Sequence, residues 1–174
     1  MARRFCLEPH EPRRTSRQSN PDVITDPQFI GLAEVGLGLL LDYLEPLGFV
    51  EDLPLLLRIV IGGCLLALGG SMAARARATF FAVGTSDNPM QPALAMISTD
   101  IFSHVRNPMY QGGTLLLIGL ALILGSDWMV ILVVPALILL HFGVVVREEH
   151  YLGKKFDDVY RRYRTEVPRY GWKF

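Results

Sequence analysis

The chain has 174 residues, of which 51% are hydrophobic and 20% are charged, with 17 basic residues against 17 acidic ones. This zero net charge gives no reason to expect a nucleic-acid partner. The apolar residues stand in long blocks and the charges stand between them, which excludes an ordinary soluble domain. The pattern predicts an all-α fold, a polytopic membrane helix bundle.

The first 27 residues are polar and lack the apolar centre that a signal peptide needs. They are basic because they carry Arg3, Arg4, Arg13, Arg14 and Arg17. We interpret residues 1–27 as a disordered or loosely docked cytoplasmic tail, with a polybasic segment that binds anionic lipids as the alternative. Residues 28–174 then form a single membrane domain.

Four apolar stretches predict transmembrane helices at about 28–44, 54–76, 108–125 and 128–147. The first carries Glu34, which is either an interior polar contact or part of a substrate tunnel. The second carries four glycines that allow a neighbouring helix to approach closely, namely Gly62, Gly63, Gly69 and Gly70. A tight turn at Ser126 and Asp127 makes the last two stretches an antiparallel hairpin.

Lys and Arg are concentrated in the N-terminal tail, in the 75–106 loop and in the C-terminal segment. The positive-inside rule then places both termini in the cytoplasm. Residues 148–165 predict an amphipathic helix on that side, because apolar side chains recur at spacings of three and four. These are Leu152, Phe156, Val159, Tyr160 and Tyr163.

The hairpin brings Arg106 and the pair Glu148 and Glu149 together, because they flank its two helices at the same membrane face. One cation and two carboxylates at a partly dehydrated boundary are costly unless they pair with one another or bind a ligand. The cluster is therefore either a structural ion-pair network or a polar ligand site. The two cysteines and four histidines show no metal-ligand spacing, so no metal is expected.

These features resemble the integral-membrane methyltransferases, which include isoprenylcysteine carboxyl methyltransferases and phospholipid N-methyltransferases. The resemblance rests on Arg106-Asn107-Pro108-Met109-Tyr110-x-Gly112, on the hairpin and on Arg147-Glu148-Glu149 after it. It continues through Phe156, Tyr160 and Tyr163 to an ending at Val167-Pro168-Arg169, and the loop from Gly84 to Pro92 is similar to that of bacterial members. Asn107 stands where a histidine is common, and Asp100 and Ser103 stand where many members have a glycine and a basic residue.

The resemblance implies S-adenosylmethionine as the methyl donor and a lipophilic or membrane-associated acceptor of the isoprenylcysteine carboxylate, phospholipid amine or thiol type. It implies Arg106, Glu148 and Glu149 as catalytic residues. It implies a cofactor pocket formed by Asn107, Pro108, Tyr110, Gly112, Glu148 and Glu149. A bacterial-type member would lie in the inner membrane. Two alternatives stay open: an NADPH-dependent enzyme of the sterol-reductase type, and a non-catalytic membrane scaffold on the same fold.

Overall fold

The computed structural model describes residues 22–84, 88, 91 and 93–173, and the regular structure within these ranges is helical throughout. Five α-helices follow one another along the chain: α1 (Pro27–Leu44), α2 (Leu55–Val83), α3 (Pro108–Leu124), α4 (Asp127–Leu140) and α5 (Val146–Glu166). A 3₁₀ turn, η1 (Asp100–Ser103), precedes α3, and a π-helical turn, η2 (His141–Val145), joins α4 to α5. The all-α prediction is confirmed. Residues 1–21 of the predicted tail and most of the 84–92 loop lie outside the described residues.

Two helices in the described part of the chain are long and apolar enough to cross a membrane, namely Leu55–Val83 and the continuous helix Asp127–Glu166. Large apolar side chains also face outward on α1, α2 and α4, and Phe29, Leu56 and Phe142 are each more than 60% exposed. An apolar surface of this extent is suited to lipid rather than to water. The chain is therefore a membrane protein.

Glycines allow α2 and α3 to pack at very short range. A Cβ atom added at Gly69 would lie 2.5 Å from the carbonyl oxygen of Gly112, and one at Gly62 would lie 2.7 Å from that of Gly119. Backbones can approach this closely only where there is no side chain, which is how small residues drive helix association in membranes. The prediction for Gly62 and Gly69 is thus confirmed. A Cβ atom at Gly63 would meet nothing within 4 Å, and one at Gly70 would lie 4.0 Å from the Leu116 side chain, so these two glycines are not at a close contact.

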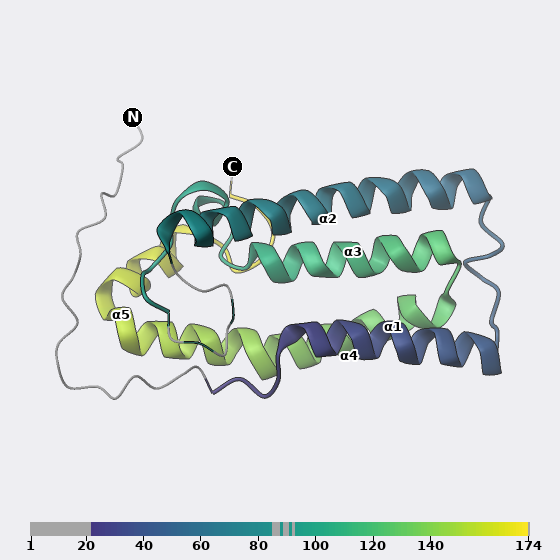
Figure 1. Ribbon diagram of the computed structural model, residues 1–174, viewed down its shortest axis with the longest axis horizontal. Helices are drawn as coiled ribbons and strands as arrows, with labels where there is room; N and C mark the ends of the chain where they lie inside the picture. Colours follow the sequence, from purple (N-terminus) through teal and green to yellow (C-terminus); the bar gives the residue numbers. More distant parts are fainter. Residues whose placement is uncertain (1–21, 85–87, 89–90, 92, 174) are drawn as a thin grey trace.

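The bundle consists of two helix pairs, since α3 packs chiefly on α2 and α4 packs chiefly on α1 (Figure 1). Gly38 of α1 faces Met129 of α4 at close range. At the end remote from Arg106, buried Asp127 accepts hydrogen bonds from the backbone N–H groups of Gly48 and Val50. These bonds fasten the 45–54 connection to the start of α4.

The turn η1 begins with Asp100 in the left-handed region, at φ 52°. This conformation is one that glycine adopts readily and that aspartate tolerates better than most other residues. The Asp100 side chain accepts a hydrogen bond from the Thr79 hydroxyl at 3.1 Å, which links η1 to α2. Behind it, Ile101 and Phe102 are buried against α2. A glycine at this position would adopt the same backbone without steric cost.

Replacing Asp100 by valine is expected to lower stability by about 1–2 kcal/mol more than replacing it by glycine. Both changes remove the bond to Thr79, so this loss cancels when the two variants are compared. The measurement is the thermal unfolding of both variants in the same detergent. Equal midpoints for the two variants would show that the backbone conformation at this position carries no cost.

Candidate active site

Arg106 lies in the link between η1 and α3, at the end of the bundle where α5 begins. Its backbone N–H donates to the carbonyl oxygen of Pro168 at 2.9 Å. The side-chain amide of Asn107 donates to the carbonyl oxygen of Arg169 at 3.3 Å. Residues 167–173, which we call the C-terminal strap, therefore lie across the start of α3.

Glu149 is buried between two arginines. Its carboxylate accepts two hydrogen bonds from the Arg169 guanidinium, at 3.0 Å from Nε and 2.6 Å from Nη2. Arg106 Nη1 forms an ion pair with Oε1 of the same carboxylate at 2.9 Å. The pairing with Glu149 raises the pKa of Arg169 above its ordinary value. The structure thus brings Arg106 and the end of the hairpin together, as the sequence predicts, and adds a second cation.

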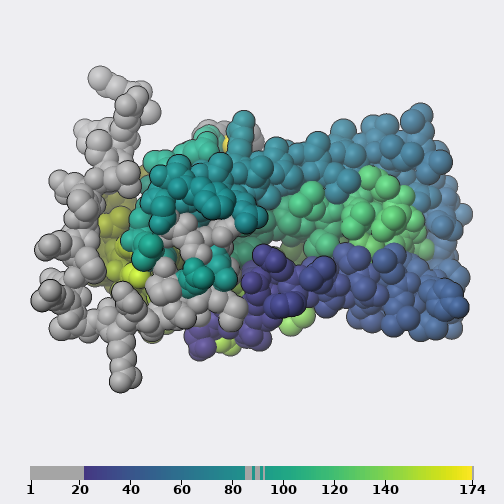
Figure 2. Space-filling model, viewed as in Figure 1, coloured from purple at the N-terminus to yellow at the C-terminus, as the bar shows by residue number. Residues whose placement is uncertain are grey.

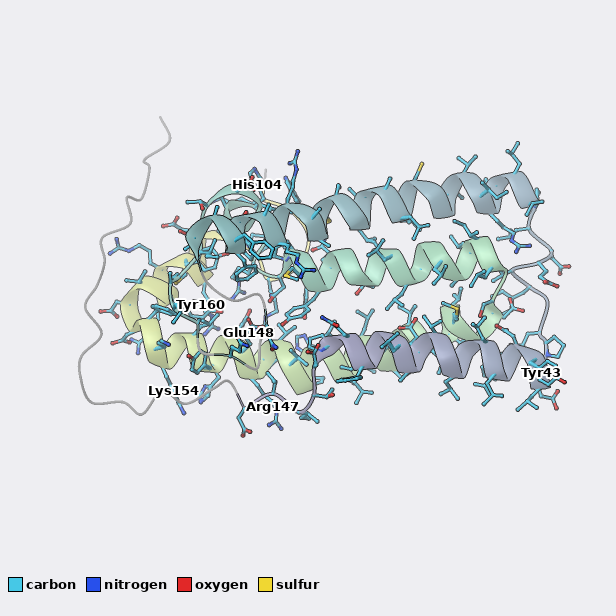
Figure 3. The ribbon with its side chains drawn as sticks, in the orientation of Figure 1. Tyr43, His104, Arg147, Glu148, Lys154 and Tyr160 are labelled. Atoms are coloured by element: carbon cyan, nitrogen blue, oxygen red, sulfur yellow. The ribbon has the colours of Figure 1, made fainter. Side chains whose placement is uncertain are left out.

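Glu148 faces a different direction from Glu149, although the two are adjacent in the chain. Its Oε2 accepts a hydrogen bond of 2.8 Å from the Tyr110 hydroxyl of α3. Figure 3 shows Glu148 and Tyr160 on the inner side of α5, whereas Arg147 and Lys154 point away from the bundle. Glu148 and Tyr110 therefore form a polar pair inside the bundle that is separate from the Glu149 ion pairs.

A cavity of about 500 Å³ lies between the two helix pairs. Its polar end is formed by Arg106, Asn107, Tyr110 and Glu148, and it continues between apolar side chains of α3 and α4 that include Leu117, Val133, Ala136, Leu137 and Leu140. The space-filling view shows the surface hollowed between α1 and α3 (Figure 2). A volume of this size accommodates an organic ligand, and its lining suits a molecule with one polar and one apolar end.

A second, smaller cavity of about 90 Å³ adjoins the first. The residues that line both cavities, and so stand between them, are Phe80, Asn88, Phe102, Arg106, Asn107 and Glu148. The far side of the smaller cavity is formed by Glu149, Tyr151, Leu152, Tyr160 and Tyr163 of α5 together with residues 93–97. The polar cluster therefore touches two adjoining spaces, of which only the larger extends along the apolar helices.

The Arg106 guanidinium has hydrogen-bonding capacity left over. Its side chain is only 10% exposed and its Nη1 is paired with Glu149, whereas its Nε has no hydrogen-bond partner among the described residues. A buried donor without a partner is costly. Its place on the cavity wall indicates that a ligand can supply the missing acceptor.

The other predicted site residues occupy different surroundings. Pro108 is the first residue of α3, where its missing N–H is tolerated, and it lines the large cavity. Gly112 instead faces α2, as described above, and the neighbouring Gly113 lines the cavity. Within the described ranges, no group of three or more His, Cys, Asp or Glu side chains is placed to hold a metal ion.

Sequence reasoning did not assign a site role to Arg169, Tyr160 or Tyr163. Tyr160 is buried beside the smaller cavity, and the Tyr163 hydroxyl donates to the Phe102 carbonyl oxygen at 2.7 Å. For Arg169 a signal was available in the sequence Val167-Pro168-Arg169. The proline ends the helix and fixes the direction of the backbone, so the arginine that follows it has a defined position. Its partner, Glu149, lies twenty positions earlier and is not visible from spacing.

The phospholipid methyltransferase family model matches residues 57–159. This range is more than half of the chain and includes Arg106, Tyr110, Glu148 and Glu149, while α1 and the C-terminal strap lie outside it. No match is found among curated proteins or among solved structures.

Proposed function

Because the chain belongs to the phospholipid methyltransferase family, we propose that it is an S-adenosylmethionine-dependent methyltransferase acting on a lipophilic or membrane-associated small acceptor. The observation that carries this proposal is the large cavity, which has charged and hydroxyl groups at one end and apolar side chains along its length. Such a cavity can hold a polar donor beside the headgroup of an acceptor whose tail lies among the helices.

The residues at the polar end fit the proposed cofactor. S-adenosylmethionine supplies an activated methyl group on a sulfonium, and it also carries a carboxylate, an ammonium group and ribose hydroxyls. The guanidinium of Arg106, whose Nε–H has no partner among the described residues, suits the carboxylate. The carboxylate of Glu148 suits the ammonium or the hydroxyls, and Tyr110 holds that carboxylate in place.

Four other residues support this pocket. Asn107 and Pro108 shape the chain at the start of α3, where both line the cavity. Gly112 allows α2 to pack closely against α3, and Glu149 orients Arg106 through their ion pair. Displacement at a methyl carbon needs little covalent help, so positioning of the two reactants and exclusion of water would supply most of the rate.

The proposal includes an arrangement in the membrane. The 18 residues of α1 and the 17 of α3 correspond to about 27 Å and 25 Å, close to the thickness of a hydrocarbon core. With α2 and α4 they make four spans. From the distribution of Lys and Arg we infer that both termini and the Arg106 cluster lie on the cytoplasmic side. We further propose a bacterial inner membrane as the location, with a basic tail at 1–27 and one domain at 28–174.

The test is a comparison of ligands on the purified protein in lipid nanodiscs. We expect S-adenosylhomocysteine to raise the thermal unfolding midpoint and NADPH to leave it unchanged, because only a ligand of the native state stabilises it. Methyl-labelled S-adenosylmethionine should then label a total lipid extract. A shift with NADPH alone would favour a reductase, and the absence of both a shift and a labelled product would favour a scaffold.

A further inference from the structure

Glu34 is a buried carboxylate without a partner. The residue is 4% exposed, and neither of its carboxylate oxygens has a hydrogen-bond partner among the described residues. It stands seven residues after the start of α1 and lines the large cavity together with Ile30 and Gly31 of the same helix. It lies outside the residues that the family model matches.

A structural role does not account for Glu34. The other buried carboxylates of the bundle are satisfied, since Asp127 accepts two backbone hydrogen bonds and Glu149 binds two arginines. An ionised carboxylate without such partners is strongly unfavourable in an apolar interior. An apolar side chain at position 34 would avoid this cost. The carboxylate is therefore best explained by a group that enters the cavity and pairs with it.

The negative charge of Glu34 favours a positively charged group as its partner. The other charged residues on the cavity wall are Asp26, Arg77, Arg106 and Glu148, and the last two belong to the polar end assigned above to the cofactor. A carboxylate or thiolate acceptor would place a second negative charge beside Glu34. An ammonium group is complementary to Glu34 before the reaction, and its methylated product is still a cation afterwards.

We propose that Glu34 is the residue that recognises the methyl acceptor, as the counter-charge of a protonated amine on a lipophilic molecule. This inference rests on the proposed methyl transfer. The protonated amine gives one proton to the Glu34 carboxylate and becomes a neutral nucleophile. Its lone pair forms the N–C bond to the methyl carbon while the C–S bond breaks and its electron pair stays on sulfur. One proton then leaves Glu34 for solvent, and the methylated ammonium departs.

The decisive variant is Glu34→Gln, which keeps the shape of the side chain and removes its charge. The matched control is Glu45→Gln, the same change at the exposed C-terminal end of the same helix. Binding of dodecylamine to each protein in nanodiscs is measured by calorimetry without cofactor, so that no turnover contributes. Methyl transfer is then measured with dodecylamine, dodecanethiol, dodecanoate and phosphatidylethanolamine, and binding of S-adenosylhomocysteine is measured in parallel.

We expect Glu34→Gln to weaken dodecylamine binding at least about tenfold and to slow methylation of the amine about 100-fold, while S-adenosylhomocysteine binds as in the wild type. Transfer to dodecylamine but not to phosphatidylethanolamine would assign a free lipophilic amine, and the reverse would assign a lipid headgroup. Preferred transfer to the thiol or the carboxylate would overturn the inference, as would equal behaviour of the two variants. A wild-type protein that binds no S-adenosylhomocysteine would instead overturn the proposed function.

Discussion

Glu149→Ala is expected to destabilise the folded protein by about 3–5 kcal/mol, the usual cost of removing one partner from a buried ion pair. The change leaves the guanidinium groups of Arg106 and Arg169 facing each other with no anion between them. The Glu149 side chain is only 6% exposed, so water cannot replace it readily. The C-terminal strap should detach from α3, because Arg169 is one of its anchors.

The measurement is urea or thermal unfolding of Glu149→Ala in mild detergent. Asp158→Ala is the matched control, since Asp158 is an exposed member of α5 that pairs with Arg161 at 3.8 Å, and exposed pairs contribute little. A second variant, Glu149→Ala combined with Arg169→Met, should recover part of the loss because it removes one uncompensated charge. If Glu149→Ala has the same unfolding midpoint as Asp158→Ala, the ion pairs of Glu149 do not hold the strap.

The meeting of Arg106 with the end of the hairpin was predictable from the sequence. Two helices of near-equal length joined at Gly125 and Ser126 can only run antiparallel, so the residues that flank them meet. The separate roles of Glu148 and Glu149 were not predictable in this way. Adjacent helical residues point about 100° apart, and the sequence does not say which of them faces the arginine and which faces the cavity.

The C-terminal strap was harder to foresee. The helix α5 is interrupted at Asp157, whose φ of 39° and ψ of −114° are not helical, and the chain turns back toward α3 (Figure 1). Val159, which the sequence predicts on the apolar face of this helix, is 53% exposed. No proline or glycine marks the position, so the periodicity of the apolar residues predicts one continuous helix through it.

The pairing of the helices was also beyond sequence reasoning. The helices are apolar on most sides, and lipid is as apolar as the helix interfaces, so no amphipathic stripe shows which faces meet. Small residues gave the best available signal, and Gly62 and Gly69 do mark the contact of α2 with α3. The cavity lies between the helix pairs because α1 packs mainly on α4 and only weakly on α3. No residue pattern in the sequence predicts this pairing.

Glu148→Gln is expected to weaken the binding of S-adenosylhomocysteine about 10- to 100-fold without unfolding the protein. Hydrogen bonds to a charged group contribute about 1.5–3 kcal/mol, and the change replaces a charged acceptor by a neutral one of the same shape. Glu148 differs from Glu149 in that its protein partner is a neutral hydroxyl, that of Tyr110. Its loss therefore leaves no buried cation unpaired, and the effect should fall on the ligand rather than on the fold.

Calorimetry of Glu148→Gln against Glu166→Gln, an exposed glutamate of the same helix, isolates this effect from the change in net charge. Tyr110→Phe completes a double-mutant cycle with Glu148→Gln. If Tyr110 acts by holding the carboxylate in place, its removal should weaken binding in the wild type but have little effect once Glu148 is already glutamine. Additive losses would mean that Tyr110 contacts the cofactor independently. Equal affinities of Glu148→Gln and Glu166→Gln would remove Glu148 from the cofactor site and leave Arg106 as its charged anchor.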